Sequence, residues 1–213
     1  MYLSGKAREV LWAYLKKNIL VYALAILVFV LGVILGAIAV KALTVEQKQE
    51  LIGYLSQFFA SLEKGTLAAK HDLARQAIFS NLKTVAIIWL MGITIIGIPV
   101  VLAVLFTRGF VIGFTVGFLA QEMVLKGVIF AIAAVLPHNL ITIPALIVAS
   151  VAAISFSALL IKKKFFKNNH NLRHCFLGYL FLTLAIAIVC VVASLVEAYI
   201  TPVFMKWVTT YLV

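Results

Sequence analysis

Charged residues are scarce in this chain, and acidic residues are the scarcest. Aspartate and glutamate number 7 against 18 lysines and arginines, so charged side chains make up only 12% of the 213 residues. A soluble globular domain carries about 25% charged residues. Because 65% of the residues are hydrophobic and the mean hydropathy is +1.16, the composition excludes a soluble domain. It indicates an all-α integral membrane protein.

Cysteine pairs and catalytic groupings are also missing. Cys175 and Cys190 are the only cysteines, and they give neither a disulfide framework nor metal-ligand spacing. His170 and His174 have helical metal spacing, but they lie among basic residues with no acidic partner. No nucleophile stands beside a base, and no phosphate loop or catalytic carboxylate pair is present. We therefore expect no enzyme, no cofactor and no metal. Since no soluble basic face exists, we also expect no nucleic-acid partner.

Long apolar runs dominate what remains. Each approaches the roughly 20 residues that a helix needs to cross a bilayer. The predicted spans are residues 19–40, 84–106, 109–125, 139–161 and 176–196. The first follows Lys17 without a cleavage-site pattern, so we interpret it as a retained span within a single membrane domain, residues 1–213. Basic residues precede the first span and follow the fourth, which predicts a cytoplasmic N-terminus and an extracytoplasmic C-terminus.

The largest predicted extracytoplasmic segment, residues 42–82, is amphipathic. Thr44 and Gln47 have the spacing of a capping box that opens a helix. A second amphipathic stretch covers residues 66–81. We expect a helical hairpin that lies on lipid, on a second copy of the chain or on a partner. The residues that we expect to contact a partner are Leu51, Leu55, Phe58 and Phe59.

The region around the third span contains a glycine stripe and a short apolar piece. Gly109, Gly113 and Gly117 are four residues apart, which lines one helix face with hydrogen atoms only. In lipid such a face favours tight helix packing, within one chain or across a dimer. Residues 127–136 are too few to cross a membrane, so we expect a re-entrant or interfacial segment that stops at Pro137.

Polar residues interrupt the later apolar runs at two motifs. In "LPHNLITIP" (136–144), Pro137 and Pro144 each remove an amide donor, and His138 and Asn139 offer polar groups for the carbonyls left free. In "EAYITP" (197–202), we interpret Glu197 as a carboxylate at a helix end. The alternative is a transporter or channel site on a broken helix. It would use His138, Asn139, Glu197 and Glu122, although Glu122 could instead pair with Lys126.

A set of motifs in fixed order resembles one known family. They are "LSQFF" (55–59), Asn81, "GITIIGIPV" (92–100), "GFTVGFL" (113–119), "VLPHNLITIP" (135–144) and "EAYITP" (197–202). Together they are similar to the stage II sporulation protein M family over most of the chain.

This resemblance implies a multi-pass protein of the bacterial plasma membrane, at the mother-cell or septal membrane during forespore engulfment. It implies a scaffold role rather than a hydrolase role. The implied partners are stage II sporulation protein P, an amidase/endopeptidase, and stage II sporulation protein D, a lytic transglycosylase. Both act on peptidoglycan, so the resemblance links the chain to cell wall remodelling. It implies residues 42–82 as their docking surface.

Overall fold

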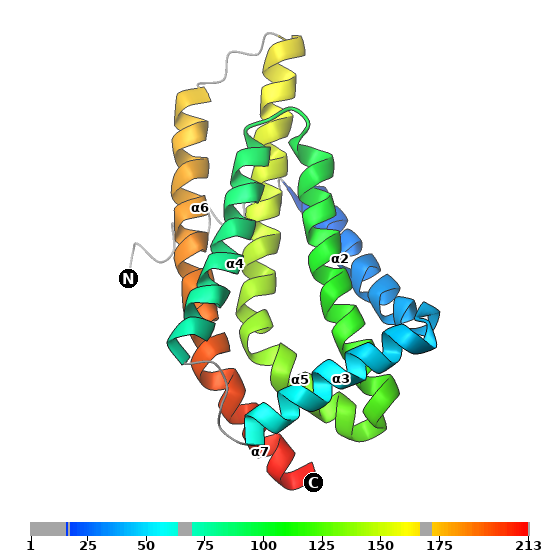
Figure 1. Ribbon diagram of the computed structural model, residues 1–213. Helices are drawn as coiled ribbons and strands as arrows, with labels where there is room; N and C mark the ends of the chain where they lie inside the picture. The colour runs from blue at the N-terminus through cyan, green and yellow to red at the C-terminus, as the bar shows by residue number, and fades with distance from the viewer. Residues whose placement is uncertain (1–15, 17, 64–69, 167–171, 213) are drawn as a thin grey trace.

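The computed structural model describes residues 16, 18–63, 70–166 and 172–212 of the chain. Within these ranges all regular secondary structure is helical, as the composition predicts, and Figure 1 shows the helices packed as an elongated bundle. In chain order the elements are α2 (Ile19–Ala39), the short η1 (Val40–Ala42), α3 (Val45–Glu63), α4 (Lys70–Gly92), α5 (Gly97–Phe166), α6 (Leu172–Leu195), η2 (Val196–Ile200) and α7 (Thr201–Leu212).

Three helices in the described ranges are long and apolar enough to cross a membrane. They cover Ile19–Ala42, Gly97–Lys163 and Leu172–Val208. The five crossings predicted from the sequence are therefore not confirmed. Helix α4 is not among the three, because charged side chains such as Asp72 and Arg75 lie in its first half.

The predicted span 84–106 is wrong, because two helices meet within it. Helix α4 ends at Gly92, and the chain turns before α5 begins at Gly97. Within the turn, the Thr94 amide donates to the Met91 carbonyl at 3.0 Å and the Gly97 amide donates to the Thr94 carbonyl at 3.2 Å. A Cβ atom at Gly97 would collide with the Met91 carbonyl oxygen, so this close turn requires glycine.

Helix α5 consists of two arms that meet at Val124. The backbone of this residue has φ 50° and ψ −128°, which is not helical. The first arm, residues 97–123, and the second arm, residues 125–166, run in opposite directions (Figure 1). A Cβ atom at Gly127 would collide with the Leu119 carbonyl, which shows how closely the arms approach at the reversal.

This reversal changes the boundaries of the next predicted elements. The third predicted span, 109–125, extends back to Gly97, and the fourth, 139–161, extends back to residue 125. Residues 127–136 are not a separate piece that stops at Pro137. They form the first turns of the second arm, which continues through Pro137 and Pro144.

The two ends of the bundle differ in what they bring together. At one end, the Ser155 hydroxyl donates to the Asn18 side-chain oxygen at 3.1 Å, and the Ser157 hydroxyl donates to the Thr94 carbonyl at 2.8 Å. The start of α2, the α4–α5 turn and the end of α5 with exposed Lys163 therefore share this basic end. The opposite end, which we call the α3 end, holds α3, the reversal and α7 (Figure 1).

Helix α2 packs on the first arm of α5 through glycine on both sides. A Cβ atom at Gly109 would meet the Phe29 carbonyl, and one at Gly113 would meet the Val33 carbonyl. On the facing helix, Gly32 and Gly36 lie equally close to the α5 backbone. The stripe predicted from the sequence is thus placed at a contact within one chain. Gly117 lies beside Ala37, with 3.0 Å between the added Cβ position and the Ala37 Cα.

Helix α3 crosses the α3 end of the bundle rather than forming a hairpin with α4 (Figure 1). Its start confirms the predicted capping box, since the Thr44 amide donates to Gln47 Oε1 at 3.0 Å and the Gln47 amide donates to Thr44 Oγ1 at 3.3 Å. Helix α4 instead enters the bundle and packs against α5 and α6. The predicted hairpin over 42–82 is not confirmed, and residues 64–69 lie outside the described residues.

The core of the bundle lies between α4, α5 and α6. Tyr179 on α6 is buried, and its hydroxyl donates to the Trp89 carbonyl at 3.1 Å. Its ring stacks on Phe156 with 5.0 Å between centroids. Nearer the α3 end, Asn81 on α4 is buried and donates its amide to the Ser194 hydroxyl on α6 at 2.9 Å. These contacts fix α4 beside α6, which in turn positions the polar residues described next.

Candidate functional site: a polar cluster inside the bundle

Four helical elements bring polar side chains to one cavity of about 550 Å³. The polar lining residues include Thr84 of α4, Arg108 of the first α5 arm, His138 and Asn139 of the second arm, and Glu197 of η2. Arg108, His138 and Glu197 therefore share one lining, although they come from three different helical elements. Charged groups among membrane helices are costly and are usually found where they face water, a ligand or each other.

Arg108 uses only part of its hydrogen-bonding capacity. Its Nη2 atom donates to the Thr84 hydroxyl and, at 3.5 Å, to the Ser80 carbonyl. A guanidinium group has five N–H donors, so its Nε–H and two Nη1 hydrogens have no protein partner in the part of the chain that the structure describes. No ion pair joins Arg108 to Glu197 there either, although both line the same cavity.

His138 lies directly after Pro137, within the second α5 arm, which stays helical there. Its Nδ1 atom is buried and has no hydrogen-bond partner among the described residues. The Asn139 amide donates to the Val135 carbonyl at 2.8 Å, and the Thr142 hydroxyl donates to the His138 carbonyl at 3.0 Å. These side chains therefore bond to carbonyls other than those left free by the prolines, which we had expected His138 and Asn139 to satisfy.

Glu197 occupies a widened helical turn. Residues Val196–Ile200 form a π-helix, in which the Thr201 amide reaches the carbonyl of Val196. The Thr201 hydroxyl is directed to the same carbonyl at 3.5 Å. Pro202 has no amide hydrogen to continue the regular pattern, which accounts for the wider turn at this position. Such turns occur frequently at functional sites.

The interpretation of Glu197 as a carboxylate at a helix end is wrong. The helix does not stop at Pro202, because α7 continues to Leu212. Glu197 therefore lies inside a long helical segment and faces the cluster rather than the end of a span. The fifth predicted span, 176–196, is correspondingly shorter than the observed stretch of helix.

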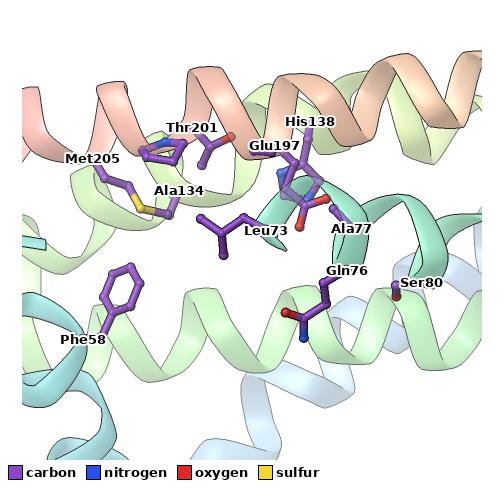
Figure 2. Close-up of a pocket in the computed structure, with 12 residues that line it drawn as sticks. Phe58, Leu73, Gln76, Ala77, Ser80, Ala134, His138, Glu197, Thr201 and Met205 are labelled. Carbon is purple, nitrogen blue, oxygen red and sulfur yellow. The ribbon is translucent and has the colours of Figure 1, made fainter. Parts of the chain in front are cut away.

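A second cavity of about 410 Å³ adjoins the first, and Figure 2 shows its lining. His138 and Glu197 line both cavities, and in Figure 2 these two side chains lie together at one point of the lining. Phe58 of α3 and Met205 of α7 lie elsewhere along the lining, and Leu73 of α4 is drawn between them and the shared pair. The second cavity thus leads from the shared residues toward the α3 end.

The expected partner-contacting residues are divided by the structure. Leu55 and Phe58 are half-buried and pack against a small apolar cluster that includes Leu119 and Phe130 of α5. Leu51 is also half-buried, and the side chain of Phe59 lies outside the described residues.

The candidate transport residues are also divided. His138, Asn139 and Glu197 meet at one cavity, whereas Glu122 does not line it. Val124 interrupts the helix between Glu122 and Lys126, so the helical spacing that suggested a pair does not apply. Among the described residues, no group of three His, Cys, Asp or Glu could hold a metal. His170 lies outside them.

Arg108 is the functional candidate that the sequence reasoning missed. It lies between two predicted spans, 84–106 and 109–125, and was given no functional role. A signal was present, because Arg108 is the only charged residue between Lys83 and Glu122. A lone charge inside an apolar stretch of this length marks a functional site by default. The false boundary at residue 106 placed it in a loop and hid that signal.

Comparison with known proteins adds a single finding. No curated protein and no solved structure matches the chain. A family model described as "Stage II sporulation protein M" matches residues 25–202, which include α2 to η2 almost completely. The matched region contains every residue of the polar cluster. The chain belongs to the stage II sporulation protein M family, a sporulation-related family of membrane proteins.

Proposed function

We propose that this chain is a membrane scaffold that recruits peptidoglycan hydrolases to the septal or engulfing membrane during endospore formation. The observation that carries the proposal is the position of α3. This helix is fixed to the bundle through Leu55 and Phe58, while Val45, Ile52 and Tyr54 remain exposed. Tyr54 has 62% of its surface exposed. Family membership supports the sporulation context.

The proposed docking face differs from the face expected from the sequence. Leu55 and Phe58 already contact this chain, so they hold α3 in place and are less available to a partner. We therefore propose that the exposed residues Ile52 and Tyr54 contact the partner instead. The proposed partners are the stage II sporulation proteins P and D, and a second copy of the chain or membrane lipid would use the same face.

The proposed orientation puts α3 outside the cell. Lys16 and Lys163 are exposed at the basic end, and positively charged residues favour the cytoplasmic side. The α3 end would then face the space in which peptidoglycan hydrolases act. The N-terminus would lie in the cytoplasm and the C-terminus outside.

Crosslinked affinity purification from the sporulating host tests this proposal. The wild-type chain should recover wall hydrolases with crosslinks to residues 45–63. The variants Ile52→Asp and Tyr54→Asp should lower that recovery at least fivefold while the membrane part stays folded. Lys163→Gln changes the charge by the same single unit at the opposite end and should leave recovery unchanged. Recovery of the chain alone from wild-type cells would refute the scaffold.

A second function is favoured by one observation, the cavity that holds Arg108, His138 and Glu197 between membrane helices. This arrangement suits a small transporter or channel. The corresponding test is flux through liposomes that contain the purified chain. A pH-dependent flux that is lost in Glu197→Gln and retained in Glu46→Gln, an exposed control on α3, would favour this function. Equal flux in all three chains would exclude Glu197 from it.

A further inference from the structure

The cluster presents two opposite charges that do not pair with each other. Arg108 directs a guanidinium group toward the cavity of about 550 Å³, and Glu197 contributes a carboxylate to the same lining. No direct ion pair joins them in the described part of the chain. If the cavity served only structure, a direct Arg–carboxylate pair would be the expected arrangement, because it neutralises both charges at the lowest desolvation cost.

The unused hydrogen-bond donors of Arg108 indicate that a ligand would carry an acceptor group such as a carboxylate. Its Nη2 atom is engaged by Thr84 and Ser80, which fixes the plane of the guanidinium group. The Nε–H and the two Nη1 hydrogens have no partner among the described residues. Each of these hydrogens can donate a single charge-assisted hydrogen bond to a carboxylate, whereas both two-donor edges of the group include the engaged Nη2.

Glu197 indicates that the ligand would also carry a positively charged donor group. Its carboxylate accepts no hydrogen bond from the described residues, although it lines both cavities together with His138. It belongs to the π-helix, and it lies at the lining that the two cavities share. An ammonium group, with three N–H donors, is the complementary partner for such a carboxylate.

The sum of the charges restricts the ligand further. A simple anion bound at Arg108 would be repelled by Glu197, and a simple cation bound at Glu197 would be repelled by Arg108. A solute that carries both groups satisfies both side chains, and its net charge is zero. Since charges interact strongly in the low-dielectric surroundings of membrane helices, a zwitterion is favoured over either simple ion.

We propose that the cavity binds a small zwitterionic solute, with its carboxylate on Arg108 and its ammonium group on Glu197. The class is that of free amino acids and short peptides. Asn139 and His138 line the same cavity and add polar surface for the amide or side chain of the solute. The second cavity, of about 410 Å³, gives a longer solute room toward the α3 end.

The binding site deepens the transport candidate and is independent of hydrolase recruitment. A solute can bind without crossing, so binding and flux are separate measurements. Binding without flux would support the site and refute transport. Loss of binding would leave the scaffold proposal untouched.

Titration calorimetry on the purified full chain in lipid nanodiscs tests the site. The probes are alanine and alanylalanine, each compared with its N-acetylated form, which is only an anion, and its amide form, which is only a cation. We expect at least one free form to bind and both of its capped forms to bind at least tenfold more weakly, which corresponds to about 1.4 kcal/mol. This comparison uses the wild-type chain and does not depend on any variant folding.

Two variants assign the ends of the solute. Arg108→Gln should weaken binding of the uncapped probe at least tenfold. In this variant the uncapped probe should bind no more tightly than its amide form. In Glu197→Gln the uncapped probe should bind no more tightly than its N-acetylated form. The matched controls are Arg75→Gln and Glu46→Gln, which are exposed and line neither cavity. Absence of binding by both free probes, or equal binding of free and capped probes, would overturn the proposal.

Discussion

Gly113 lies where the backbones of α2 and α5 touch, so a single methyl group there has no space. The added Cβ would meet the Val33 carbonyl, and backbone cannot move aside as a flexible side chain can. At Gly117 the nearest atom is the Ala37 Cα at 3.0 Å, so the conflict is milder. An added methyl group is therefore expected to clash more severely at Gly113 than at Gly117 on the same face of α5.

We expect Gly113→Ala to lower the stability of the chain by about 2 kcal/mol, since overpacking costs about 1–3 kcal/mol. Gly117→Ala should cost less. Gly178→Ala is the matched control, because no atom lies within 4 Å of its added Cβ. Thermal unfolding in one detergent would measure all three. Equal melting temperatures for Gly113→Ala and Gly178→Ala would contradict the tight contact.

Asn81 offers a second prediction at this scale. Its buried amide donates to Ser194, which itself donates to the Cys190 carbonyl at 2.9 Å. Asn81→Ala should lower stability by about 1 kcal/mol, as the loss of one hydrogen bond does. A double-mutant cycle with Ser194→Ala should give a coupling of about 0.6 kcal/mol, typical of bonds between membrane helices. An additive double variant would show that the bond contributes nothing.

Some residue-level features were accessible from the sequence and others were not. The capping box was predicted from two residue types at fixed spacing, because such local geometry depends on neighbours in the chain. Arg108 meets Glu197 only after three helices pack together, and no local pattern encodes that distance. His138 and Glu197 were flagged as polar residues in apolar runs, but only the packing of α5 against η2 brings them to one cavity.

The breaks in α4 and α5 belong to the scale of elements. Hydropathy counts apolar side chains and does not report backbone direction, so the run 84–106 read as one span. The signals were glycines at 92 and 97 and Pro99 two residues later, which is a typical sequence of helix end and helix start. At the second reversal, Val124 carries no such signal, because valine rarely adopts φ 50°.

Val124 therefore gives a prediction at the scale of elements. Its backbone conformation is one that glycine adopts freely and a β-branched residue does not, at a cost of about 1–3 kcal/mol. Val124→Gly should raise the melting temperature, since its side chain is 69% exposed and little packing is lost. Leu125→Gly, at an equally exposed neighbour, should lower it. If Val124→Gly melted at a lower temperature than the unsubstituted chain, the chain would not reverse its direction at this residue.

At the scale of the whole molecule, the two ends of the bundle should meet different compartments. The α4–α5 turn lies at the basic end, so Ile96→Cys and Lys163→Cys should react with a membrane-impermeant maleimide only from the cytoplasmic side. Val45→Cys and Lys206→Cys should react only from outside. The native cysteines would first be replaced by serine or alanine. If Cys at position 96 reacted from neither side, residues 84–106 would cross the membrane as the single span predicted from the sequence.

The overall class and family of the molecule followed from the sequence, since composition and motif order carry them. The packing partners of the helices did not follow. Helix α3 shows why, because amphipathicity predicted an apolar face but not what covers it. The structure places Leu55 and Phe58 of that face, half-buried, on the chain itself, so the chain covers part of the face that we expected a partner to cover.

The widened turn at Glu197 also sets the rotational phase of everything after it. A π-turn holds about one residue more than an α-turn, and one residue rotates a helix by about 100°. Met205 and Val208 of α7 reach the cluster around Leu119 and Phe130 because of that extra residue. Deleting one residue from the turn would leave two intact helices, yet it would rotate α7 out of register with the cluster. A one-residue surplus thus keeps the C-terminal helix in phase with the rest of the bundle.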